Sequence, residues 1–133
     1  MDEKETYRQR VGQQGEEIAA NYLQHQGYQI LDRNYHSRFG EVDLVAEKDD
    51  VVVFVEVKAR TSASFGLPEE SVTAEKLAKI YDTALLWLQQ HPEKPDDWRV
   101  DVIAIQMDKG LQPKDIQHFI DIGVKYLRID FLR

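Results

Sequence analysis

Gly40-Glu41-Val42-Asp43-Leu44-Val45 and Val51-Val52-Val53-Phe54-Val55-Glu56-Val57-Lys58 are the two stretches that decide the fold of this 133-residue chain. Both are rich in the β-branched residues that favour strands, yet each carries an acid where a core residue would be expected. An unpaired charge in a buried sheet costs several kcal/mol of lost hydration. A bound divalent cation would compensate the charge of these acids and so explain their positions, because Asp43 and Glu56 supply hard oxygen ligands. Lys58 lies beside them in the sequence. The pattern therefore indicates metal-dependent cleavage of a phosphodiester.

The two stretches predict a hairpin of adjacent strands, residues 41–47 and 51–59, joined by the polar connection Lys48-Asp49-Asp50. Side chains alternate between the two faces of a strand. In the first strand this alternation groups Val42, Leu44 and Ala46 on one face, and Glu41, Asp43 and Val45 on the other. In the second strand it groups Phe54, Glu56 and Lys58 on one face, opposite Val53, Val55 and Val57. We expect the two strands to present Asp43, Glu56 and Lys58 together.

The remaining elements follow from helical spacing, strand-like alternation and breaker residues. We expect a polar tail over residues 1–8, a helix over 10–26, a strand over 28–34, a turn over 36–40, a loop over 60–68, a helix over 73–91 with Thr73 as its cap, and strands over 99–106 and 116–120. The order α-β-β-β-α-β-β predicts an α/β fold with one mixed sheet of four or five strands flanked by helices. The whole chain, residues 1–133, is expected to form a single domain.

Composition narrows the class of protein. With 42% hydrophobic and 31% charged residues the chain should be globular, and without cysteine it has no disulfide and no thiolate zinc site. No apolar run approaches the ~20 residues that span a bilayer, and the acidic start is unlike a secretory signal. We therefore expect a soluble cytoplasmic protein with no membrane partner.

The net charge of −7 argues against tight, sequence-independent binding of DNA, which depends on Lys and Arg neutralising phosphates. Several basic residues nevertheless lie near the expected site in the sequence, namely Arg33, Arg38, Lys58, Arg60, Lys76 and Lys79. The local charge can therefore be opposite to the global one.

Spacing alone leaves an ordinary alternative open. Glu56-Val57-Lys58 is also what an exposed strand with a short-range ion pair looks like, and such a pair contributes only about 0–1 kcal/mol. Taken by itself, the spacing favours this interpretation.

A longer ordered set of motifs resembles a known family. The set comprises Gly15-Glu16 with Ala19 and Tyr22-Leu23, Gly27-Tyr28, Arg33-Asn34, Gly40-Glu41-Val42-Asp43, Val53-Phe54-Val55-Glu56-Val57-Lys58 with Arg60, Phe65-Gly66, Lys76, and Arg99-Val100-Asp101-Val102. It covers nearly the whole chain and resembles the YraN family of proposed endonucleases. That family lies within the PD-(D/E)XK nuclease superfamily, with restriction enzymes and archaeal Holliday-junction resolvases. The resemblance implies a restriction-endonuclease-like core.

The resemblance also implies roles for individual residues. Asp43 matches the motif aspartate, Glu56 the central acid and Lys58 the motif lysine, although Val42 rather than proline precedes Asp43. These three would be catalytic, with Asp43 and Glu56 holding Mg²⁺, for which Mn²⁺ can substitute. Glu16 matches a further acid that related resolvases add to the metal site. A solvated helix glutamate remains an equal alternative for Glu16.

Arg38, Arg60 and Lys76 are weaker candidates for contacts with nucleic acid, since each can equally be a surface charge. The expected function is hydrolysis of phosphodiester bonds in DNA, with branched or structured DNA as a reasonable substrate. The alternative is a module that keeps the nuclease fold, binds nucleic acid or a partner protein, and cuts nothing. RNA stays open as a substrate. Because the related resolvases act as symmetric dimers, a homodimer is one expected state.

Overall fold

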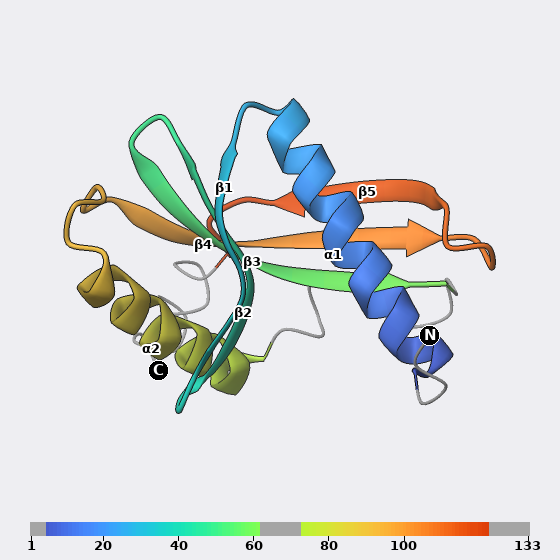
Figure 1. Cartoon of the computed structure of the whole chain (residues 1–133), viewed down its shortest axis with the longest axis horizontal. Coiled ribbons are helices and arrows are strands. Elements are labelled where there is room, and N and C mark those ends of the chain that lie inside the picture. The colour runs from blue at the N-terminus through green and yellow to red at the C-terminus, as the bar shows by residue number, and fades with distance from the viewer. Residues whose placement is uncertain (1–4, 62–72, 123–133) are drawn as a thin grey trace.

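The computed structural model describes residues 5–61 and 73–122 (Figure 1). The elements in chain order are α1 (Tyr7–His25), β1 (Gln29–Ser37), β2 (Gly40–Lys48), β3 (Val51–Arg60), α2 (Ala74–Gln90), β4 (Trp98–Met107) and β5 (Pro113–Phe119). This order confirms the predicted α-β-β-β-α-β-β arrangement. Residues 1–4 of the expected tail and 62–68 of the expected loop lie outside the described residues.

The five strands form one mixed sheet in the order β1-β2-β3-β4-β5. All neighbouring pairs are antiparallel except β3 and β4, which are parallel and are joined through α2. The two helices lie on opposite faces of the sheet (Figure 1). We call these the α1 face, whose buried cluster includes Leu23, Val53 and Ile103, and the α2 face, where Trp87 packs against Phe54. Neither described helix has the length and apolar character needed to cross a bilayer.

Helix α1 begins earlier than expected, so Tyr7 and Arg8 lie in its first turn and not in a polar tail. Thr6 is the N-cap and forms a capping box with Gln9, in which each side chain accepts a hydrogen bond from the backbone N–H of the other residue. The Tyr7 hydroxyl also donates to the Lys109 carbonyl at 3.2 Å. These bonds satisfy backbone donors and fix the start of the helix against the β4–β5 connection.

The first hairpin is also longer than expected. Strand β1 runs to Ser37 and β2 starts at Gly40, so much of the expected turn over residues 36–40 is strand. The second hairpin is as predicted, since Lys48 pairs with Val51 across Asp49 and Asp50. Both aspartates have positive φ, which suits a two-residue turn between antiparallel strands.

Strand β3 loses its partner on one side halfway along its length. Its pairing with β2 ends at Leu44–Val55, whereas its pairing with β4 continues to Arg60–Gln106. The second half of β3 therefore lacks a β2 ladder. The gap between these two strands is where the candidate site lies.

The alternation predicted for β2 is wrong at this point. Leu44 packs in the core of the α1 face, whereas Val42 and Val45 both pack in the core of the α2 face. Asp43 lines a pocket together with Glu16 of α1, so Asp43 and Leu44 are consecutive residues on the α1 side of the sheet. In the β1–β2 register Asp43 and Asn34 both lie between the pairs Arg33–Leu44 and Tyr35–Val42, and Asn34 has a left-handed φ of 50°. A residue in that conformation breaks the regular pleat.

A glycine lets α1 cross β3 closely. Gly15 is buried, and a Cβ there would overlap the Cβ of Ala59 and approach Val57. Only a residue without a side chain allows this separation. The crossing places the next helix residue, Glu16, at the gap between β2 and β3.

A buried polar network ties β4 and β5 together. Asp101 has no exposed surface, and its carboxylate is bonded to Arg99 Nε at 3.0 Å, His118 Nε2 at 2.7 Å and the Asp121 N–H at 2.9 Å. Burial alone would raise the pKa of Asp101, but these hydrogen bonds and the Arg99 charge hold it below its ordinary value. The charge is fully compensated, so this acid is structural.

Candidate functional site

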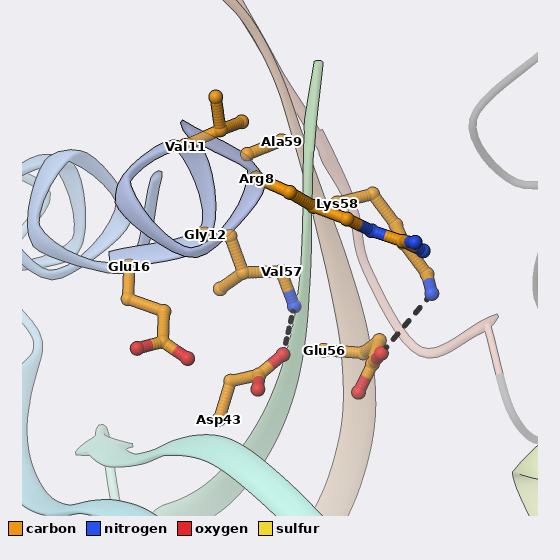
Figure 2. Close-up of a pocket in the computed structure, with 9 residues that line it drawn as sticks. All are labelled: Arg8, Val11, Gly12, Glu16, Asp43, Glu56, Val57, Lys58 and Ala59. Atoms are coloured by element: carbon orange, nitrogen blue, oxygen red, sulfur yellow. Dashed lines mark hydrogen bonds and ion pairs between the residues drawn. The ribbon is translucent and has the colours of Figure 1, made fainter. Parts of the chain in front are cut away.

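A pocket of about 270 Å³ lies where β2 separates from β3, beneath the first turns of α1 (Figure 2). The residues that line it come from α1, β2 and β3: Arg8, Val11, Gly12, Glu16, Asp43, Glu56, Val57, Lys58 and Ala59. The structure thus brings together all four residues expected at the acidic site, including Glu16. Because the β2–β3 ladder has ended, side chains from both faces of β3 reach the same pocket.

The Asp43 side chain replaces the backbone carbonyl that would accept a hydrogen bond from β3 if the β2–β3 pairing continued. Its Oδ2 accepts a hydrogen bond of 2.7 Å from the Val57 N–H, which Figure 2 marks with a dashed line. Burial raises the pKa of Asp43 to about 6, and Glu16 adds to the rise, while the bond from Val57 opposes it. The sheet therefore holds a carboxyl group whose charge is costly near neutral pH.

Glu16 is the second acid of the pocket. Its carboxyl group lies in the pocket with that of Asp43 (Figure 2), and its negative charge helps to raise the pKa of Asp43. Burial is the main reason that the pKa of Glu16 is raised, while its hydrogen bonds with Asp43 and Asn34 oppose the shift. This environment differs from the solvated helix face that was the alternative for Glu16.

Glu56 and Lys58 form an ion pair, with Nζ 3.2 Å from Oε1 and both side chains about one-fifth exposed (Figure 2). Burial and then the charge of Asp43 raise the pKa of Glu56 to about 7, against the opposing charges of Lys58 and Lys76. The three carboxyl groups are thus electrostatically coupled.

The three weaker candidates are placed differently. Lys76, in the first turn of α2, is near enough to Glu56 for its charge to lower the pKa of that acid. Arg60 ends β3, and Arg38 lies in the β1–β2 turn with its guanidinium 4.8 Å from the centre of the Phe39 ring. Neither arginine is among the residues that the structure shows lining the pocket.

Arg8 lines the pocket, although its place in the sequence predicted a polar tail. Its side chain reaches from α1 across the pocket toward β3, the strand that carries Lys58 (Figure 2). The signal that could have found it is the Thr6…Gln9 spacing of a capping box, which predicts a helix that starts at Tyr7.

Three carboxyl groups and no soft ligand are the donor set that Mg²⁺ or Mn²⁺ prefers. Burial is the main reason that the pKa values of all three acids are raised, and the charge of a neighbouring acid of the pocket adds to each rise. A divalent cation would relieve both costs. In the described part of the chain no three such side chains are spaced as a ready-made metal site. Asp43 accepts from the Val57 N–H, and Glu56 is paired with Lys58. The residues fit the ion in their chemistry, and binding would require the acids to be ionised and Glu56 to give up its ion pair with Lys58.

Comparison with known proteins adds a family match. The family model of the uncharacterised protein family UPF0102 matches residues 15–105, a range that begins at the close-approach glycine of α1 and includes Asp43, Glu56 and Lys58. A UPF0102 protein of Syntrophomonas wolfei is 47% identical over 111 residues, which cover 84% of this chain and 95% of that protein. A UPF0102 protein of Vibrio parahaemolyticus is 44% identical over 117 residues, covering 87% of this chain and 96% of that protein.

Proposed function

The chain belongs to the uncharacterised protein family UPF0102, the YraN family that its motifs resemble, and from that premise we propose that it is a metal-dependent endonuclease that hydrolyses phosphodiester bonds in DNA. One observation carries the proposal: Glu16, Asp43, Glu56 and Lys58 line a single pocket at a break in the sheet. A purely structural strand has little use for acids at positions where their ionisation is opposed.

Each residue has a proposed role. Asp43 and Glu56 hold Mg²⁺, with Mn²⁺ as a substitute, and Glu16 assists them. The ion, when bound, supplies charge to polarise the phosphate and lowers the pKa of a bound water. Lys58 orients the attacking water and offsets the negative charge that builds on the phosphate. Its contact with Glu56 holds the ammonium group at the edge of the acidic cluster.

An acidic pocket would repel a phosphate unless cations lie beside it. Lys58 and Arg8 line the pocket, and the charge of Lys76 acts on Glu56 from α2. Local positive charge of this kind supports a DNA backbone as the substrate of a chain whose net charge is −7. The resemblance to resolvases favours branched or structured DNA, and it implies products with a 5′-phosphate.

The test is cleavage of branched, nicked and single-stranded DNA by the pure protein with Mg²⁺ or Mn²⁺. Glu56→Gln and Lys58→Met should each lower the cleavage rate at least about a hundredfold, the size typical of losing a group that acts in the transition state. A parallel assay with RNA of the same sequence separates the two substrate classes.

A second ion pair provides the matched control. Lys94 Nζ lies 3.2 Å from Glu47 Oε1, and these side chains are nearly as buried as Glu56 and Lys58. Glu47→Gln and Lys94→Met lie outside the pocket and should leave the cleavage rate unchanged. Activity that survives in Glu56→Gln, or that falls equally in the controls, would contradict the assignment.

The rival function is a non-cleaving module that binds nucleic acid or a partner through the same fold. The acidic net charge and the lack of a ready-made three-ligand cluster among the described residues favour it. Binding of DNA without metal, and without product from any substrate, would support this rival.

A further inference from the structure

Asn34 and Arg33 bind α1 at consecutive positions. Because Asn34 is left-handed, two successive side chains of β1 reach the same helix. Arg33 Nη1 donates to Glu17 Oε2 at 2.8 Å. With its amide assigned so that the nitrogen faces the acid, Asn34 donates to the two carboxylate oxygens of Glu16 at 3.0 and 3.3 Å.

The Arg33–Glu17 contact lies on the surface, whereas the Asn34–Glu16 contact holds a side chain of the pocket. Glu17 is exposed, and its ion pair with Arg33 lies on the surface. Glu16 lines the pocket, and Asn34 is bonded to it while Asp43 contacts the same carboxyl group. Asn34 itself is exposed, so its hydrogen bonds compete with water and contribute little to folding. Their effect is on direction, since bonds to both oxygens fix the rotation of the carboxyl group.

The backbone conformation of Asn34 also restricts which residue types can occupy this position. A non-glycine residue with a φ of 50° in the middle of a strand is uncommon, and asparagine is one of the few types that tolerate it. Asn34 and Asp43 both lie between the pairs Arg33–Leu44 and Tyr35–Val42 of the β1–β2 ladder, where β2 leaves the regular alternation. One left-handed residue therefore places an amide against Glu16 at the same level as Asp43.

We propose that Asn34 is a positioning residue of the site, which holds the Glu16 carboxyl group toward Asp43 so that the two acids act on one divalent cation. The metal part of this inference rests on the proposed function. Residues that orient metal ligands in this way typically change metal affinity by about 10–100-fold when they are replaced.

Replacing Asn34 with glycine separates positioning from folding. Glycine adopts the left-handed conformation without strain but has no amide to donate. In calorimetric titration of the full chain with Mn²⁺, Asn34→Gly should weaken the affinity at least about tenfold relative to the wild type. Its thermal midpoint should change little.

The matched control is Asp49→Gly. Asp49 has a φ of 52°, nearly the same as that of Asn34, but it lies in the β2–β3 turn. It should show a similar small change in midpoint with unchanged Mn²⁺ affinity. Wild-type affinity in Asn34→Gly, or equal weakening in Asp49→Gly, would overturn the proposal.

A second measurement does not depend on metal or on cleavage. The side-chain amide resonances of Asn34, followed by ¹⁵N NMR without divalent cations, should shift in Glu16→Gln and stay in place in Glu17→Gln. Resonances that respond to neither variant, or equally to both, would refute the positioning contact. If they behave as expected while the wild type binds no Mn²⁺, the contact stands and the nuclease proposal fails.

Discussion

Asp43 is a hydrogen-bond acceptor for the sheet and an acid of the pocket at the same time. The Val57 N–H needs an acceptor because β2 no longer supplies a carbonyl there, and Asp43 Oδ2 provides it. Only an oxygen is needed for this bond, so a neutral side chain of the same shape would serve. The negative charge is therefore required by the proposed function and not by the fold.

Asp43→Asn should make the protein more stable at pH 8 and inactive. The pKa of Asp43 is about 6 in the folded chain against an ordinary value of 3.8. The free energy of unfolding therefore falls as pH rises from about 4 through 6, and the loss is complete at higher pH. A shift of this size corresponds to a gain of about 1–3 kcal/mol for the neutral variant at pH 8, and the gain should vanish near pH 4. Urea denaturation in EDTA at the two pH values measures it. A variant less stable than the wild type at pH 8 would contradict this account.

Arg8→Ala tests whether the Arg8 guanidinium of α1 contacts a phosphate of DNA bound at the pocket. Losing one charge-assisted contact should raise the KM for DNA about tenfold and reduce the dependence of binding on salt, with little change in kcat. Arg10→Ala is the control, because Arg10 lies in the same helix but its guanidinium faces the Tyr7 ring at 5.8 Å. Equal effects of the two variants would mean that only general charge matters.

At the scale of elements, the approach of α1 to β3 sets the position of Glu16. Gly15 makes that approach possible, since any Cβ there meets Ala59. Gly12, one turn earlier on the same helix, has nothing within 4 Å of the position that a Cβ would take. The two glycines therefore differ in their distance to the sheet, although Gly12 is also exposed and lines the pocket.

Gly15→Ala should push α1 away from β3 and lower the free energy of unfolding by about 1–3 kcal/mol, the usual cost of overpacking. Gly12→Ala should raise it by about 0.5–1 kcal/mol, because alanine favours a helix and meets open space. Chemical denaturation compares the two variants. A stabilising effect of Gly15→Ala would show that the helix can move without cost, and Glu16 would then not be fixed by the crossing.

The elements that sequence predicted correctly depend on local signals. Thr73 caps α2 by accepting from the Lys76 N–H, and Lys48-Asp49-Asp50 closes the β2–β3 hairpin as expected. The run of valines in β3 identified the central strand, which has partners on both sides over its first half. Each of these signals lies within a few residues of the feature that it predicts.

The incorrect sequence predictions mostly concern features that depend on neighbouring strands or helices and not on the local sequence. Asp43 leaves the regular alternation at the same place in the ladder as the left-handed Asn34 of the neighbouring strand, and periodicity within β2 carries no information about that residue. Grouping Asp43 with Glu56 succeeded for a different reason, namely that β2 and β3 separate and open both faces to one pocket. The error about Arg8 was avoidable, since the capping box at Thr6 is visible in the sequence.

At the scale of the whole molecule, two sets of buried acids respond to pH in opposite directions. The pKa of Asp101 is lowered by its partners, so its stabilising contribution is present above the ordinary value of about 3.8 and is lost as pH falls further. The raised pKa values of Asp43 and Glu56, about 6 and 7, mean that stability falls as pH rises from about 4 through 7. Growing net negative charge above the pI of about 5.0 acts in the same direction.

The protein in EDTA should therefore be most stable near pH 4–5, below the neutral range where many proteins have their maximum. Saturating Mg²⁺ should remove much of the loss at pH 7–8, because an ion bound by the carboxylates stabilises the folded chain. Thermal unfolding from pH 3 to pH 9, with EDTA or Mg²⁺, measures both curves. Curves that coincide would exclude a cation from this pocket, whereas a maximum at pH 8 in EDTA would contradict the raised pKa values.

The bond between Asp43 and the Val57 amide makes that amide a natural reporter of the state of the pocket. Most amides in a sheet point at a carbonyl, whose charge never changes, but this one points at a group that can gain or lose a proton or bind an ion. The resonance frequency of this single backbone proton should thus follow the occupancy of the pocket. A spectroscopist could watch protonation, ion loading and DNA engagement at one residue, without attaching any label to the site.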